Sequence, residues 1–345
     1  MMTSMISGNY SSRKDWIELI GKDAGGLIHH PAFGNIQGNS FPHAEDLQGI
    51  SWPEISVLPD PARLSGIVLD KSQGFFSASD LRARILYALT HGAEHLRFHL
   101  NPEGKPEDLS FLLEGVYLDM VRLSLVLSAD WFVRTDSLSK AELQSVAGPL
   151  NLEMGLEDFW NHREDFKNLV STNSSITLTP VLEFSLSHAD LWAETLSRAL
   201  IKFQSIQAEF PEARFVLRLL LSNDFLTGIS AIRAFRMWSA QTGLYPFIFE
   251  AGPDSALLGS EPFSNQIYQT TAALAAVLGG SETVWMLPSD YNLENPSPDW
   301  MRTALHTMHI LKQESHLDLV RDPLEGSYYV EDLSLKIMDH LMTAV

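Results

Sequence analysis

The chain has 345 residues, of which 45% are hydrophobic, and a formal net charge of -19 from 24 Lys and Arg against 43 Asp and Glu. So acidic a surface repels phosphate backbones and anionic lipid, which argues against nucleic-acid and membrane partners. The absence of cysteine excludes disulfides, thiolate metal sites and cysteine nucleophiles. With no apolar run near the roughly 20 residues of a membrane helix and no signal-peptide core, we expect a soluble, cytoplasmic protein.

The first part of the chain, residues 1–64, is expected to form an irregular N-terminal arm on a larger body. The segment GKDAGGLIHHPAFGNIQGNSFPHAEDL is rich in Gly, Pro, Asn and His, and WPEISVLPDP after it is a short extended piece interrupted by prolines. Such composition is typical of turns and loops rather than of long regular elements.

From residue 65 the chain repeats one unit, a short apolar strand followed by an amphipathic helix. Several of these helices begin at Ser, Asp or Pro and end at Gly, as capped helices do. The strands are expected at 66–70, 95–100, 124–130, 150–155, 176–181, 214–221, 246–252 and 283–288.

Eight strand–helix units with right-handed crossovers predict an α/β fold, a (β/α)8 TIM barrel over residues 65–315. Residues 316–345 are expected to pack on the barrel and are a candidate start of a linker to a further domain. An open doubly wound sheet is the alternative. It is disfavoured because no Gly-rich phosphate loop follows the first strand.

Alternation along the strands predicts which side chains point into the barrel, since the outward face must be apolar where helices cover it. Most barrels fill the axis with Val, Ile and Leu, but here Arg97, Glu153, Thr177, Arg218 and Glu250 are expected inside. Buried charges are costly unless paired, so we predict an internal ion-pair network. The alternative is a ligand channel, in which these five residues are the candidate substrate-binding residues at the interior or mouth.

The sequence also offers a candidate metal site, and the same alternation places further residues inside the barrel. His95 and His99 share a strand face and could bind a metal with a nearby carboxylate, although satisfied core histidines are the better interpretation. There is no H-E-x-x-H or G-x-S-x-G motif. The tryptophans are expected in the core or at an interface. The other expected inward residues are Ser124, Val126, Ser128, Asp130, Asn151, Thr179, Val216, Leu220 and Ile248.

The segment QESHLDLVRDPLEGSYYVEDL, residues 313–333, resembles the end of the substrate-binding barrel of methylmalonyl-CoA mutases, where a D-P-x-x-G-S-x-Y-V-E sequence follows the eighth helix. AIRAFRMWSA (231–240), GGSETVWMLPSD (279–290) and, weakly, IQGNSFPHAEDLQG (36–49) are similar to other parts of that family. We interpret residues 313–333 as architecture: Pro323 ends a helix, Gly326 turns the chain, and Tyr328, Tyr329 and Val330 pack on the barrel.

The resemblance implies two kinds of chain. Catalytic chains of the family bind acyl-CoA along an axis lined by small polar residues and carry a cobalamin domain, and some bacterial enzymes add a non-catalytic chain of the same fold. Here FIFEAGPDS places Glu250 and Ala251 where the resemblance implies a basic, polar pocket, VWMLPSD replaces a His-Thr-Asn segment, and the cobalamin signature D-x-H-x-x-G is absent.

These departures favour a non-catalytic chain of the small-subunit type. The resemblance then implies a heterodimer with a catalytic large subunit that interconverts (R)-methylmalonyl-CoA and succinyl-CoA. It implies no cofactor on this chain and adenosylcobalamin on the partner. The alternative is an active acyl-CoA mutase half that works with a separate cobalamin protein and shapes its site with Arg97, Arg218, Asp70, Asp130 and His188; acyl-CoA would bind only if the barrel is open.

Overall fold

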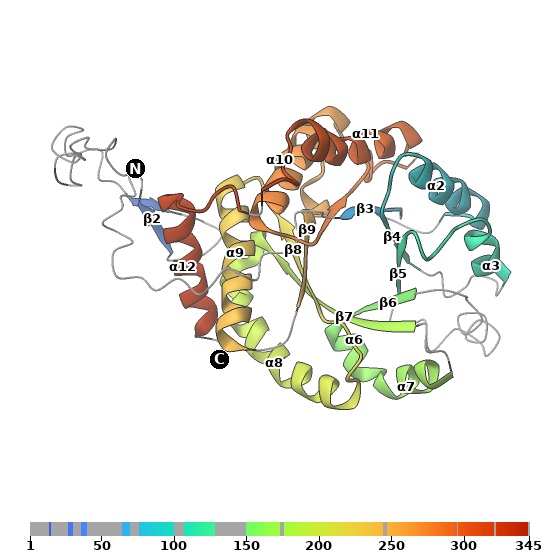
Figure 1. Cartoon of the computed structure of the whole chain (residues 1–345), viewed down its shortest axis with the longest axis horizontal. Coiled ribbons are helices and arrows are strands. Elements are labelled where there is room, and N and C mark those ends of the chain that lie inside the picture. The colour runs from blue at the N-terminus through green and yellow to red at the C-terminus, as the bar shows by residue number, and fades with distance from the viewer. Residues whose placement is uncertain are drawn as a thin grey trace, which may run out of the picture.

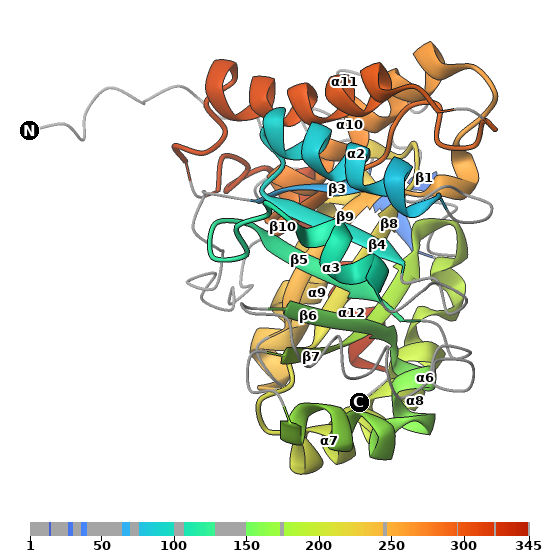
Figure 2. The ribbon, with the colours of Figure 1, turned by 90° about the vertical axis from the view of Figure 1, so that its right-hand side faces the viewer.

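A computed structural model describes residues 14, 27–29, 36–39, 64–69, 76–99, 107–127, 150–172, 176–243, 247–294, 296–320 and 322–343. Within them, parallel strands close a barrel in the order β10-β3-β4-β5-β6-β7-β8-β9, with helices around the outside (Figures 1 and 2). The predicted (β/α)8 TIM barrel is confirmed. The strands are β3 (Leu64–Val68), β4 (His95–His99), β5 (Arg122–Val126), β6 (Leu150–Gly155), β7 (Ile176–Ser185), β8 (Val216–Leu221), β9 (Ile248–Pro253) and β10 (Thr283–Met286).

The helices follow the predicted units. They are α2 (Ala78–Thr90), α3 (Glu107–Leu113), α6 (Leu156–Asn161), α7 (Arg163–Thr172), α8 (Trp192–Glu209), α9 (Phe225–Thr242), α10 (Pro262–Gly279), α11 (Pro298–His309) and α12 (Tyr328–Met342). Short helical turns also occur: η4 (Leu186–Leu191), η5 (Ser255–Leu257) and a π-helical turn, η6 (Ile310–Glu314). Most of the predicted arm lies outside the described residues; inside it, β1 (Leu27–His29) and β2 (Gln37–Asn39) pair antiparallel.

Local chemistry explains where these helices begin and end. Ser77 and Asp224 lie before α2 and α9, and their side chains accept hydrogen bonds from backbone N–H groups of the first turn. Gly243 and Gly280 end α9 and α10 in the left-handed conformation, which lacks a steric penalty only for glycine. The short helix α3 stops at Leu113, because the chain turns after it through Gly115 at φ 82°.

One strand is longer than its sequence predicted. β7 was expected to stop at residue 181, yet it continues to Ser185 and pairs with β8 along that extension. Leu182 and Phe184 in the added part are buried in the main core. Burial against the helices therefore extends the strand beyond the proline at position 180.

The segment 313–333 joins two helices of the outer layer. The helical run that begins with α11 already ends at Glu314, so the prediction that Pro323 ends it was wrong. Gly326 does turn the chain, at φ 86°. Asp322 accepts a hydrogen bond from Arg233 of α9 at 2.7 Å, and both side chains are buried.

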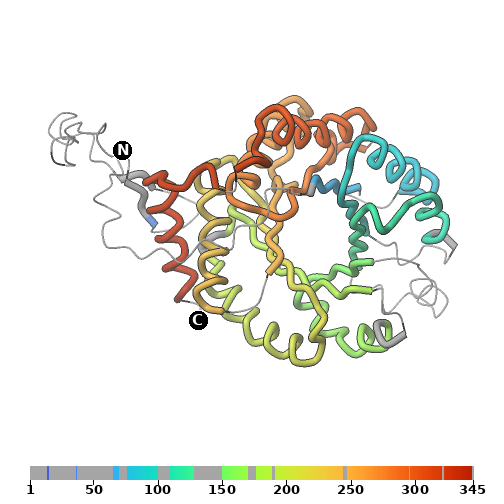
Figure 3. Tube along the Cα trace, in the orientation of Figure 1, coloured from blue at the N-terminus to red at the C-terminus, as the bar shows by residue number. Residues whose placement is uncertain are grey.

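The aromatic run after this turn forms the first turn of α12. Val330 is buried and Tyr329 is partly buried against the core, whereas Tyr328 is 43% exposed. α12 then packs along α9 on the outside of the barrel, where Figure 3 shows it in red beside the gold helix. The predicted packing on the barrel is therefore confirmed for Val330 and Tyr329 but not for Tyr328, and the Arg233–Asp322 pair adds a contact that was not predicted. No helix of the described residues is both long and apolar enough to cross a membrane.

Candidate functional site

The charged residues expected inside the barrel meet one another there. Arg97 Nε lies 3.0 Å from Glu153 Oε2, and Arg218 Nη2 lies 2.9 Å from that same oxygen. Arg218 Nη2 also lies 2.6 Å from Glu250 Oε2. Arg218 Nη1 also lies 3.9 Å from Oε2 of Glu183 on β7. Three carboxylates and two guanidinium groups therefore form one continuous network across strands β4, β6, β7, β8 and β9. The predicted internal ion-pair network is confirmed.

The centre of the network is closed to solvent. Glu153, Glu250 and Arg218 are exposed by 1%, 2% and 3%. The side chains of Arg97 and Glu183, at the border of the network, are 17% and 46% exposed. A bore wide enough for a pantetheine chain would leave accessible area on the side chains that line it. The opening between strands in Figure 1 is therefore filled by side chains at this level of the barrel.

Trp285 completes the filling of the axis. Its Nε1 donates to Glu250 at 2.6 Å, its ring centroid lies 4.4 Å from that of His95, and the Arg218 guanidinium lies 5.6 Å from its centroid. Gly66 on β3 makes room for the ring, since a Cβ at that position would lie 2.6 Å from a ring carbon. Sequence reasoning expected Trp285 in the core or at an interface and did not place it here. The available signal was a glycine within an expected strand, which often marks a close approach.

His95 is tied to the same network through a serine. Its Nε2 lies 2.8 Å from the Ser124 hydroxyl, which itself donates to Glu153. The hydroxyl therefore accepts from His95, so Nε2 carries the proton and Nδ1 is bare. Burial lowers the pKa of His95 to about 3 despite the nearby Glu153 charge, and the surrounding arginines act in the same direction as burial. His95 is thus a neutral core histidine.

The two buried carboxyl groups of the network differ in their pKa. Burial raises the pKa of Glu153, but the charges of Arg218 and Arg97, with hydrogen bonds from Ser124 and Arg218, bring it below the ordinary value. Glu250 shares Arg218 with Glu153, and burial together with the Glu153 charge holds its pKa above the ordinary value. Burial disfavours the charge on Arg218, yet both carboxylates raise its pKa overall. Glu153 is the firmly ionised member, and Glu250 is the one closer to protonation.

The carboxyl end of the barrel is partly covered by a second apolar cluster. Leu258, from the loop after β9, packs there, and its carbonyl accepts from Asn292 at 2.8 Å. The same loop is held by Asp254, which accepts from Ser185 at 2.7 Å and caps η5. Side chains that bind backbone groups fix this part of the mouth. The cluster consists of Val68, Leu258, Trp285 and Leu287, with Tyr268 and Tyr291 packed against it.

The remaining predicted site residues are not gathered with the network. Thr177 lies on β7 in register with Asn151, and within the described residues it forms no hydrogen bond with the charged groups. His188 lies in η4 and is exposed. Asp70, Ser128 and Asp130 lie outside the described residues. Within the described ranges, no three His, Cys, Asp or Glu side chains converge as a metal site would require.

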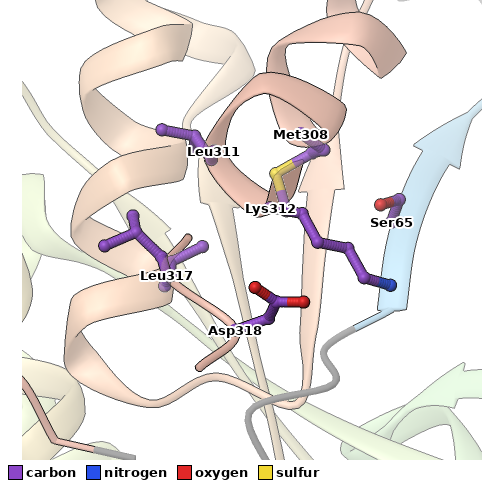
Figure 4. A pocket seen from close by; sticks show the side chains of 7 residues that line it. Ser65, Met308, Leu311, Lys312, Leu317 and Asp318 are labelled. Carbon is purple, nitrogen blue, oxygen red and sulfur yellow. The ribbon is translucent and has the colours of Figure 1, made fainter. Parts of the chain in front are cut away.

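A small cavity lies outside the strand barrel, where the outer face of β3 meets η6 (Figure 4). Ser65, Lys312 and Asp318 contribute its polar lining, and Met308 and Leu311 part of its apolar lining. Its volume of about 20 Å³ suits a single water molecule. It is too small for any part of an acyl-CoA beyond an atom or two.

Comparisons with known proteins identify relatives of the chain. The family model described as Methylmalonyl-CoA mutase matches residues 204–345, which include Arg218, Glu250 and Trp285. The methylmalonyl-CoA mutase small subunit of Streptomyces virginiae is 26% identical over 301 residues, covering 77% of this chain and 49% of that protein. The small subunit of Propionibacterium freudenreichii subsp. shermanii is 24% identical over 301 residues, covering 75% and 46%.

The resemblance predicted from the sequence is therefore confirmed, and the chain is related to methylmalonyl-CoA mutase small subunits. It spans about half the length of these relatives. Among solved structures, dihydropteroate synthase from Thermus thermophilus superposes with a TM-score of 0.42 at 17% identity, over 73% of this chain and 96% of that chain. A similarity this low assigns no function.

Proposed function

We propose that this chain is a small-subunit-type component of a methylmalonyl-CoA mutase and that it supports a catalytic large subunit without carrying out the rearrangement itself. The complex would be a heterodimer that interconverts methylmalonyl-CoA and succinyl-CoA in the cytoplasm. The proposal assigns adenosylcobalamin to the partner chain. The small-subunit relatives and the lack of cysteine, which suits a reducing compartment, support these assignments.

The observation that carries the non-catalytic role is the buried network of Arg97, Glu153, Arg218 and Glu250, closed by Trp285. Acyl-CoA is bulky and strongly anionic, so an axial site for it must be open and at least neutral. Here side chains fill the axis, and both of its arginines are already paired with carboxylates, so neither guanidinium group is free to bind an anionic ligand. Opening the axis would leave these buried charges without partners, which would lower the free energy of unfolding by several kcal/mol.

Two measurements test the proposal. In the first, the purified chain is titrated calorimetrically with methylmalonyl-CoA and with succinyl-CoA, and no heat of binding is expected up to high micromolar ligand. In the second, the chain is mixed with the cobalamin-loaded large subunit from the same organism, and a 1:1 complex is expected by size-exclusion chromatography with light scattering. The mutase activity of the mixture should exceed that of the large subunit alone after heat challenge, because the partner is stabilised.

Binding of either thioester by the isolated chain at micromolar concentration would instead favour the active half-enzyme that works with a separate cobalamin protein. Failure to form any complex with the large subunit would remove the supporting role altogether.

A further inference from the structure

The outer helix α10 has an unusual composition for its position. Its 18 residues, PFSNQIYQTTAALAAVLG, include no charged side chain. Phe263 and Ile267 lie one turn apart on its outer side and are 71% and 72% exposed. Trp300 of α11 meets Phe263 edge-on, with ring centroids 5.1 Å apart. We call these three side chains the α10 face; it lies on the outer side of the barrel, where Figures 1 and 2 show α10 and α11 together.

The neighbouring helix α9 shows how a mainly apolar helix of this outer layer packs when another helix covers it. It packs against α10 and has the same length, and all residues from 227 to 238 are buried because α12 lies over it. Its charged members Arg233 and Arg236 are buried and paired with Asp322 and Glu282. α10 has the composition of a covered helix, yet no described element covers its outer side.

A helix that does face solvent looks different. α8 carries Glu194, Arg198, Lys202 and Glu209 along its length, and Arg198 and Glu194 pair across one turn. This is the usual pattern for the outside of a barrel. Side chains as large and exposed as Phe263 and Ile267 on a charge-free helix are typical of an interface.

The charges at the border indicate which kind of partner fits. Glu261, just before α10, and Asp299, next to Trp300, are exposed, and the nearby Arg302 is already paired with Asp299 at 3.2 Å. A second copy of this chain would bring the same acidic border and its own net charge of -19, so like charges would oppose self-association. A different chain with an apolar patch bordered by Lys and Arg would be attracted.

We propose that the α10 face is the surface on which the catalytic large subunit docks, through an apolar patch that basic side chains border. This inference rests on the proposed function, because that function supplies the partner. It assigns Phe263 and Ile267 as anchors and Glu261 and Asp299 as charges that orient the partner.

The experiment compares matched variants of the full chain. Phe263→Asp and Ile267→Asp place a charge in the centre of the α10 face. Ile201→Asp is the control, because Ile201 on α8 is also 72% exposed but lies on a different helix. The affinity of each variant for the immobilised large subunit is measured by interferometry. We expect each α10 variant to weaken binding by at least about 30-fold, and Ile201→Asp to change it by less than about twofold.

A charge reversal gives a second, independent readout. Glu261→Lys should slow association and flatten its dependence on salt concentration, because the border charge steers the partner. All four positions are exposed, so thermal unfolding of the variants should match that of the parent chain and exclude misfolding as the cause.

Each possible result separates the hypotheses. If the parent chain binds the large subunit and the α10 variants bind equally well, the docking surface is wrong and the proposed function stands. If the parent chain does not bind the large subunit at all, both fail. If sedimentation shows that the chain alone dimerises and that Ile267→Asp abolishes the dimer, the occupant is a second copy and the assignment to the large subunit is overturned.

Discussion

Alternate residues of the same strands enter two very different surroundings. On β8, Leu217 and Leu219 point outward into the main core between sheet and helices, whereas Arg218 between them points into the barrel. The outer layer is built from Leu, Ile, Phe and Ala and is stabilised in proportion to the apolar area it buries. The inner space is built from charges whose burial is tolerated only because each has a partner. The outer layer should accept conservative hydrophobic exchanges, and the inner one should not accept the loss of any partner.

The largest expected loss of stability comes from substitutions on β8, where neighbouring residues face the barrel interior and the outer layer. Arg218→Met removes the cation shared by Glu153 and Glu250 and leaves two buried carboxyl groups with fewer partners, so we expect a loss of about 3–5 kcal/mol in the free energy of unfolding. Leu219→Ala, facing the outer layer, should cost about 2–5 kcal/mol through its cavity. Urea denaturation of the two variants would measure both losses.

A second substitution distinguishes a loss of charge pairing from the creation of an apolar cavity. Adding Glu250→Gln to Arg218→Met should restore part of the stability, because one uncompensated carboxyl group is removed. Adding it to Leu219→Ala should only destabilise further. Equal behaviour of the two pairs would mean that the axis is not held by charge pairing.

The next effect concerns the space that Trp285 occupies. Gly66→Ala should cost about 1–3 kcal/mol, since the new methyl group collides with the indole ring. Gly155, at the end of β6, is the control, because a Cβ there would meet nothing within 4 Å and Gly155→Ala should stay within about 0.5 kcal/mol. Thermal melts of the two variants provide the comparison. A destabilised Gly155→Ala, or an unaffected Gly66→Ala, would show that the axis is packed differently.

The pH dependence of stability tests the burial of His95. The unfolded chain takes up a proton on this side chain below its ordinary pKa of 6.5, whereas the folded chain does so only near 3. Lowering the pH from 6.5 towards 3 therefore favours the unfolded state. The loss of stability is complete once the pH is below the pKa of His95 in the folded chain. His95→Gln keeps a donor for Ser124 without titrating. Between about pH 6 and pH 4, the parent chain should lose about 1.4 kcal/mol more per pH unit than this variant. Parallel curves from denaturation at each pH would contradict a buried, neutral His95.

The smallest expected effect is a difference between the two carboxyl groups. Glutamine resembles a protonated glutamate, and the pKa of Glu153 is lowered while that of Glu250 is raised. Glu153→Gln should therefore destabilise the chain more than Glu250→Gln, by roughly 1 kcal/mol. Denaturation midpoints at neutral pH measure the order. The reverse order would assign the firmly ionised role to Glu250.

The strand–helix repeat and the alternation within strands predicted the barrel and the four charged members of its interior, because both patterns are local. Arg97, Glu153, Arg218 and Glu250 each lie on the strand face opposite to the one that carries the large apolar residues. The fifth candidate, Thr177, could not be separated from them, since alternation indicates a face but not a partner. Trp285 was missed because its importance depends on Gly66, which lies more than two hundred positions earlier in the chain.

By itself, the amino-acid order determined which side chains would leave the outer layer and enter the axis, since a period of two is set within each strand. Only the closed sheet decided that one oxygen of Glu153 would bind both Arg97 and Arg218 and that Trp285 would fill the gap beside Gly66. It also decided that α12 would cover α9, while two large side chains on the outer side of α10 stayed exposed. These outcomes depend on the register between strands and on helix packing. Both are contacts between distant segments, whose geometry exists only once the barrel has closed.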